Sequence, residues 1–156
     1  MTYLEYKNQR QAEFNALPVF FAFSNEQFKN AMEERGLTEN DTDKIYSLPG
    51  GCGGFYLRSD SEQIKNYFLK HDPLDTLLKN SEFAEDAFYY EMGNHEYHIN
   101  LQANWDVCSC FGHVEYNSWD DENEYFKQLG WEPQTIEAYK RAKKRFLQDA
   151  DERGWY

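Results

Sequence analysis

Apolar residues along the chain recur mostly at the three- to four-residue spacing of amphipathic helices. In residues 81–93, for example, Phe83, Ala84 and Ala87 share one helical face, and Gly93 marks the end of the pattern. The same spacing predicts helices at residues 2–16, 25–35, 61–70, 73–78, 81–93, 118–128 and 133–151.

Local capping signals support several of these helix boundaries. Ser24 is followed by Gln27 three residues later, which is a capping-box pattern, and Gly36 ends the helix that starts there. Ser81 and Ser118 are the expected N-caps of two later helices.

Short apolar segments bounded by turn residues predict strands. Val19–Phe23 is typical of a buried strand, and Lys44–Leu48 and Phe55–Arg58 flank the glycine-rich Pro49–Gly54 as the two arms of a β-hairpin. Residues 98–101 can form a fourth strand. The pattern therefore predicts an α+β fold with a small, mostly antiparallel sheet of three or four strands packed with about six helices.

Composition and length predict a single globular domain over residues 1–156. Hydrophobic residues make up 40% of the chain and aromatic residues 18%, which is enough to build a core. The longest apolar run, Leu17–Phe23, is too short to span a membrane, and the first residues lack the apolar segment of a signal peptide. We therefore expect a cytoplasmic protein.

The net charge of −12 is concentrated in one part of the chain. Residues 80–126 contain no Lys or Arg, and almost all of the negative excess lies there. Such a charge disfavours direct binding to DNA or to an anionic membrane. It is compatible with a solvated face or with a surface that binds a basic partner. The acidic-aromatic candidates for partner binding are Glu82, Glu85, Asp86, Glu91, Glu96, Asp106, Glu115, Trp119, Asp120, Asp121, Glu122 and Glu124.

Histidine and cysteine cluster in residues 94–113. These side chains are zinc ligands, and four of them could complete a tetrahedral site, although the spacing is not that of a common zinc motif. The candidate ligands are His95, His98, Cys108, Cys110 and His113. Residues 105–111 fit either a strand or a short helix; Cys108 and Cys110 share a face only in a strand. The alternative is an ordinary core without a cofactor.

A catalytic role has weaker support. A nucleophilic Cys108 or Cys110 needs a nearby His and a lowered pKa. The surrounding carboxylates instead raise the pKa of a thiol. No catalytic residue is assigned. The basic run Lys140–Arg145 is interpreted as a solvated helix face that offsets the acidic residues, within the protein or between protomers of a homo-oligomer.

Four phrases of the sequence together resemble a known family. They are LPVFFAFSNEQF at residues 17–28, TENDTDKIY at 38–46, FYLRSD at 55–60 and YEMGNHEY at 90–97. The chain resembles, over roughly residues 3–97, a family of small uncharacterised acidic proteins carried by phages and conjugative elements of gut and oral bacteria. The resemblance implies an accessory protein of a mobile element, located in the cytoplasm of a bacterial host cell, and carries over no catalytic residue.

Three functions follow as hypotheses. The first is a non-enzymatic inhibitor of a host defence nuclease, of the anti-CRISPR or anti-restriction type, whose acidic surface binds the basic nucleic-acid channel of the nuclease or of its guide-RNA complex. The second is a zinc-stabilised or metal-dependent domain built on the His/Cys cluster. The third is a structural or regulatory homo-oligomer.

Overall fold

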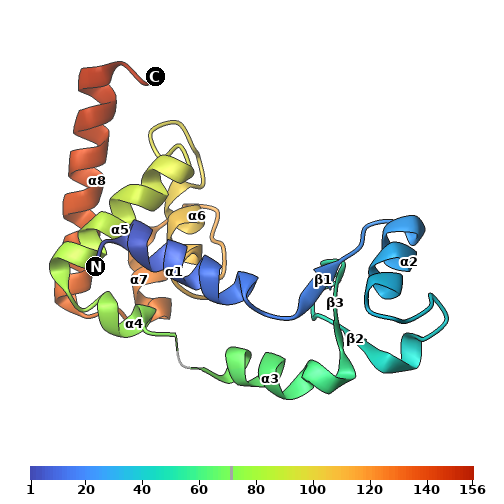
Figure 1. The fold of residues 1–156 in the computed structure, drawn as a ribbon. Coiled ribbons are helices and arrows are strands. Elements are labelled where there is room, and N and C mark those ends of the chain that lie inside the picture. The colour runs from blue at the N-terminus through green and yellow to red at the C-terminus, as the bar shows by residue number, and fades with distance from the viewer. Residues whose placement is uncertain (71) are drawn as a thin grey trace. The chain divides into compact units, whose positions relative to one another are not determined.

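The computed structural model describes residues 1–70 and 72–156 and has an α+β fold, as predicted (Figure 1). The chain divides into two compact units. The larger contains Met1–Asn8 and Asp72–Tyr156, and the smaller contains the described part of Gln9–His71. Helix α1, Tyr3–Asn15, begins in the larger unit and ends in the smaller one. Among the described residues, no helix is long and apolar enough to cross a membrane.

The smaller unit is built on a three-stranded antiparallel sheet of order β1-β3-β2. Its strands are β1 (Val19–Phe21), β2 (Ile45–Ser47) and β3 (Gly54–Leu57). Strands β2 and β3 form the predicted hairpin, with Tyr46 opposite Tyr56. Short 3-10 turns at Thr42–Lys44 and Arg58–Asp60 precede β2 and follow β3.

Two helices complete the smaller unit, namely α2 (Asn25–Glu34) and α3 (Ser61–Leu69). The Ser24 hydroxyl accepts a hydrogen bond from the Gln27 backbone N–H at 3.1 Å, which confirms the predicted N-cap of α2. The core of this unit contains Phe20, Met32 and Ile45.

The expectation of a buried strand over Val19–Phe23 was wrong in extent. Strand β1 ends at Phe21, and only Phe20 is buried in it, while Phe23 is 75% exposed. The physical reason is that β1 is an edge strand whose alternate side chains point to opposite faces, so one face alone packs on the core.

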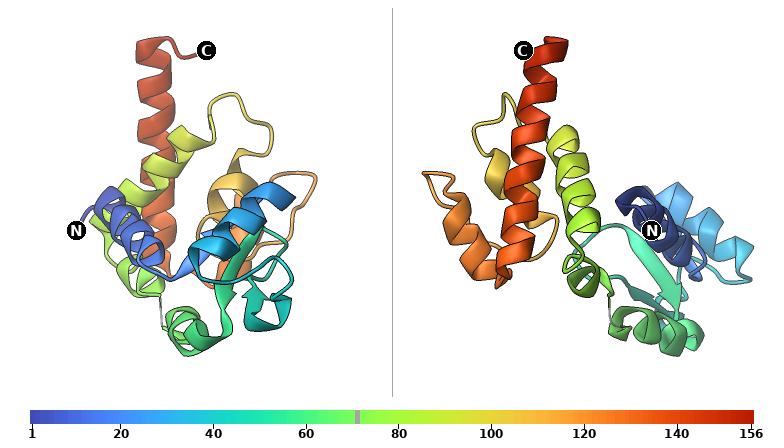
Figure 2. Two further views of the ribbon diagram at one scale, coloured as in Figure 1. Left: turned by 45° about the vertical axis from the view of Figure 1, so that its right-hand side comes forward. Right: turned by 90° about the vertical axis from the view of Figure 1, so that its left-hand side faces the viewer.

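The larger unit is helical and is organised by α5 (Ser81–Asn94) and α8 (Pro133–Arg153), which lie side by side (Figure 2). Between them in sequence come α6 (Ala103–Ser109) and α7 (Glu122–Leu129), and α4 (Leu74–Leu77) precedes α5. The core is rich in aromatic rings; for example, Phe88 packs edge-on against Tyr139 with ring centroids 5.3 Å apart. This aromatic core positions both sites described below.

Three local predictions in this unit were wrong. Residues 98–101 form turns instead of a fourth strand, and the N-caps of α5 and α7 are Asn80 and Asp121 instead of Ser81 and Ser118. Each true cap accepts a hydrogen bond from a backbone N–H of the first helical turn, which an amide or carboxylate oxygen does at least as well as a hydroxyl.

Candidate functional site

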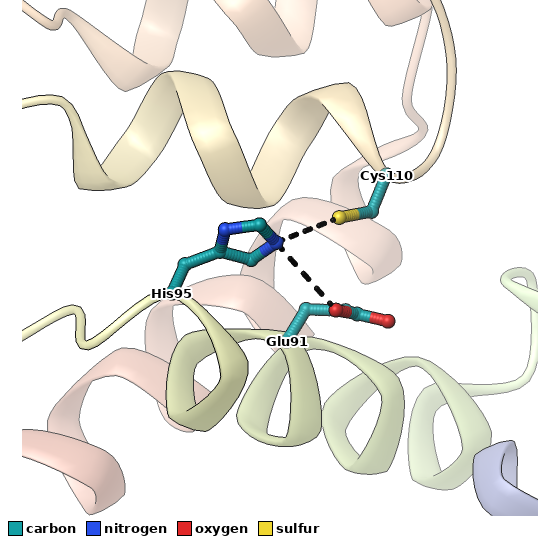
Figure 3. Close-up of side chains that lie close together, drawn as sticks. All are labelled: Glu91, His95 and Cys110. Atoms are coloured by element: carbon teal, nitrogen blue, oxygen red, sulfur yellow. Dashed lines mark hydrogen bonds and ion pairs between the residues drawn. The ribbon is translucent and has the colours of Figure 1, made fainter.

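The structure brings together two of the five predicted zinc ligands, His95 and Cys110, and adds Glu91 to them (Figure 3). Glu91 lies at the start of the last turn of α5, and His95 is the C-cap of the same helix, one turn later. Cys110 is the C-cap of α6. The ligand atoms of all three residues lie within 4.8 Å of one another.

The other three predicted ligands lie elsewhere. Cys108 is fully buried in the core, His113 is exposed in the loop after α6, and the His98 ring packs against Phe146 and Trp155. Helix α6 explains the separation of the two cysteines, because residues two apart in a helix point in different directions.

Glu91 is the centre of a buried polar network. It is 2% exposed, and its Oε1 accepts hydrogen bonds from the Tyr3 hydroxyl at 2.7 Å and from Lys7 Nζ at 2.9 Å. Its Oε2 accepts a hydrogen bond from Asn94 Nδ2 at 3.0 Å and lies 3.8 Å from His95 Nε2. An anionic side chain is tolerated in this core because each oxygen has polar partners.

Electrostatics fix the protonation of this network. Burial alone would raise the pKa of Glu91, but the hydrogen bonds from Lys7, Tyr3 and Asn94 outweigh it and lower that pKa below its usual value. The carboxylate is therefore ionised at neutral pH. Burial, together with the charge of Glu91, raises the pKa of Tyr3 far above its usual range, so its hydroxyl remains a donor.

Cys110 and His95 form a close pair, with Cys110 Sγ 3.4 Å from His95 Nε2. The geometry alone resembles a nucleophile and its base. However, burial and the neighbouring Glu91 carboxylate raise the pKa of the Cys110 thiol to about 12, so the thiol is protonated at neutral pH. Without a bound cation the pair lacks the thiolate that nucleophilic catalysis requires.

The predicted acidic surface is divided by the structure. Helix α8 neutralises part of it, because Arg141 and Arg145 both pair with Glu85 at 3.0 Å and Lys143 pairs with Glu122 at 3.1 Å. These pairs are within one chain. The basic face of α8 thus offsets the acidic residues inside the protein, the first of the two predicted alternatives.

Other acids have structural roles. Both carboxylate oxygens of Asp120 accept hydrogen bonds from α6, from the backbone N–H groups of Asn104 and Trp105, each at 2.9 Å. Asp86 accepts a bond from the Tyr3 backbone N–H, and Asp106 from the Asn100 side chain. Within residues 1–70 and 72–156, the carboxylates that have neither a hydrogen bond nor an ion pair include those of Glu82, Glu96, Glu115 and Glu124.

Large apolar side chains are exposed in the two segments that flank α6. Trp119 is 90% exposed and Leu101 is 92% exposed, while Tyr116 is half-exposed and contacts the Trp105 ring edge-on. Asp120, directly after Trp119, anchors its loop to the start of α6, where Leu101 also lies. We call Leu101, Glu115, Tyr116, Trp119, Asp121 and Glu124 the Trp119 surface. Sequence reasoning missed Leu101, which was expected in a strand.

Residues 2–116 match the family of unknown function DUF7659, and the chain belongs to this family. The match includes the whole segment in which the sequence resembles a known family, as well as Glu91, His95 and Cys110; Trp119 lies beyond it. No curated protein and no solved structure matches the chain. The family description says nothing of phages or conjugative elements, so that origin remains a prediction.

Proposed function

We propose that this protein is a non-enzymatic binding protein whose Trp119 surface binds a basic surface of another protein. The partner we favour is a host defence nuclease, whose nucleic-acid channel the protein would block as an anti-CRISPR or anti-restriction accessory of a mobile element. The observation that carries the proposal is the indole of Trp119, 90% exposed at the end of an anchored loop.

An exposed tryptophan of this kind suits the centre of an interface. Burying an aromatic side chain of this size removes roughly 150–250 Å² of surface from water, and Trp is enriched among residues that dominate binding energies. The loop is already ordered by Asp120 and by the Asn117 backbone N–H, which donates to the Tyr125 hydroxyl at 3.2 Å. A pre-ordered loop loses little entropy on binding.

The charge around Trp119 favours a basic partner. Glu115 and Glu124 are exposed and lie on either side of Trp119 in the sequence, and no cation of the described chain pairs with either. Carboxylates in such a position accelerate association with Lys- and Arg-rich surfaces, such as a channel that neutralises phosphates. The surface is narrower than the whole acidic segment, because Glu85, Glu91 and Glu122 are engaged within the chain.

The test measures binding to, and inhibition of, a restriction endonuclease and a guide-RNA-loaded CRISPR nuclease of one bacterial host. Trp119→Ala should weaken binding by at least about 30-fold, which corresponds to the ~2 kcal/mol of an interface hot spot. The double variant Glu115→Gln/Glu124→Gln should slow association at low salt and have little effect at high salt.

Glu82→Gln is the matched control, because Glu82 is also an exposed acid, lies on α5 and is not part of the Trp119 surface. It should bind and inhibit like the unmodified protein. The proposal fails if Trp119→Ala and the double variant retain full binding at both salt concentrations, or if the protein binds neither nuclease.

A further inference from the structure

We propose that Glu91, His95 and Cys110 bind a divalent cation of the zinc class. This site is separate from the Trp119 surface and does not depend on the proposed function. It replaces the five-residue His/Cys cluster expected from the sequence with a set that includes a carboxylate.

Two separations between the donor atoms are close to those in such a site, and all three are within 4.8 Å. In a tetrahedral zinc site, Zn–S and Zn–N bonds of about 2.3 and 2.0 Å place a sulfur and a nitrogen roughly 3.5 Å apart, and two lighter donors roughly 3.3 Å apart. Cys110 Sγ lies 3.4 Å from His95 Nε2, which in turn lies 3.8 Å from Glu91 Oε2. Figure 3 shows the His95 ring directed toward both partners.

The donor types select the metal. One thiolate, one imidazole and one carboxylate match the ligands of Zn²⁺, whereas Mg²⁺ and Ca²⁺ require oxygen ligands. Binding breaks the S–H bond of Cys110, releases that proton to solvent and leaves the sulfur electron pair on the metal. The charges of the thiolate and of Glu91 then balance the charge of the ion.

The surroundings already orient the carboxylate. Tyr3 and Lys7 both hold Glu91 Oε1, so that Oε2 is the oxygen directed toward His95. Partners of this kind, outside the ligand shell, fix ligand geometry in metal sites. The His95 side chain is 34% exposed, which provides a route for the ion. Three protein ligands leave a fourth position for water or for an exogenous ligand.

The experiment uses the full-length protein without an affinity tag, loaded with ZnCl₂ alone and dialysed, followed by elemental analysis. We expect about one zinc per chain. Loading with Co²⁺ should produce a thiolate-to-cobalt charge-transfer band. Cys110→Ser and His95→Gln should each lose the bound zinc, and Cys110→Ser should also lose the band.

Cys52→Ser is the matched control, because Cys52 is an exposed cysteine in the β2–β3 hairpin, and it should retain full zinc and the band. Lys7→Met should weaken zinc binding about 10- to 100-fold without removing the band. Circular dichroism in EDTA shows whether each variant is folded. If Cys110→Ser fails to fold, the cobalt band of the unmodified protein and its retention in Cys52→Ser decide the question.

The proposal is overturned if the unmodified protein holds no zinc and gives no cobalt band, or if folded Cys110→Ser retains both. Trp119→Ala should bind zinc normally, so the zinc result can be distinguished from the outcome of the nuclease-binding test.

Discussion

Glu91 shows how a single residue can depend on contacts that are remote in sequence. Its carboxylate is almost completely buried, yet Lys7 and Tyr3, both from α1, keep it ionised. Desolvation opposes the charge, and three hydrogen bonds overcome that opposition. Because the pKa of Glu91 is lower in the folded state, ionisation of this group stabilises the fold.

We expect Glu91→Gln to lower the free energy of unfolding at pH 7 by about 1–3 kcal/mol, the cost of leaving buried donors poorly paired. The stabilisation from Glu91 is fully present above its unfolded pKa of about 4.5 and is lost as the pH falls through its lower folded pKa. The difference between the two proteins should therefore shrink below about pH 4.5.

Urea denaturation in EDTA between pH 3 and 7 measures this effect, with Glu82→Gln as an exposed control on the same helix. A difference that stays constant over the whole range would contradict the assignment of the charge to Glu91.

Asn104 is a second residue whose importance comes from its contacts with core residues. Its Oδ1 accepts hydrogen bonds from the hydroxyls of Tyr97 at 2.6 Å and Tyr139 at 2.8 Å. Burial raises the pKa of Tyr139 well above its usual value, so its hydroxyl remains a buried donor that requires an acceptor.

Asn104→Ala should destabilise the fold by about 2–4 kcal/mol, because two buried hydroxyls lose their acceptor. Tyr97→Phe removes one donor and leaves Asn104 paired with Tyr139, so it should cost about 1 kcal/mol. Thermal or urea unfolding measures the stability of both variants. A smaller loss of stability in Asn104→Ala than in Tyr97→Phe would contradict the role of Asn104 as the shared acceptor.

At the scale of elements, the helical conformation of α6 depends on an interaction with a residue outside the helix. Its sequence fits a strand or a short helix, and helices this short are marginal alone. Asp120 favours the helix over the strand, because its carboxylate accepts hydrogen bonds from two backbone N–H groups in the first turn of α6. The same contact fixes the loop that presents Trp119.

Asp120→Ala should lower stability by about 1–2 kcal/mol, the usual cost of losing a helix cap. The loss has a second cause, since Asp120 has φ 49°, a left-handed conformation that Asp adopts more readily than Ala. Hydrogen exchange of α6 amides should accelerate. Glu124→Ala, an exposed position in the first turn of α7, serves as the comparison and should leave that exchange unchanged.

At the scale of the whole molecule, the larger unit is discontinuous in sequence. Residues 1–8 belong to it although residues 9–71 intervene before the rest. Tyr3 and Tyr6 of this segment are buried, and the Tyr3 ring lies edge-on to Phe83 with centroids 6.0 Å apart. The N-terminal residues thus complete a core made mainly by the C-terminal half.

Tyr3→Ala should destabilise the larger unit by about 3 kcal/mol, through the cavity it creates and the lost donor to Glu91. The protection of α5 amides against hydrogen exchange should fall by the factor that corresponds to this loss of free energy of unfolding. Leu4→Ala, at an exposed neighbouring position, should have little effect, and equal effects of the two variants would contradict this architecture.

Much of the fold could be predicted from the sequence, since its signals are local. The helices α2 and α8 and the β2–β3 hairpin follow from apolar spacing, from Ser24 and from the glycine-rich turn, all of which act within a few residues. The concentration of acids in residues 80–126 is likewise a property of the sequence alone.

Only the tertiary structure determined which residues come together in the candidate sites. Glu91 meets Lys7 across 84 positions and Cys110 meets His95 across 15, and no periodicity encodes such distances. The ion pairs of Arg141 and Arg145 with Glu85 also join residues that are remote in sequence. They neutralise one of the acids that the sequence analysis assigned to the partner-binding surface. Local patterns determine which segments form helices and strands; the packing of those segments determines which side chains share a site, because a core brings remote residues into contact to bury apolar surface.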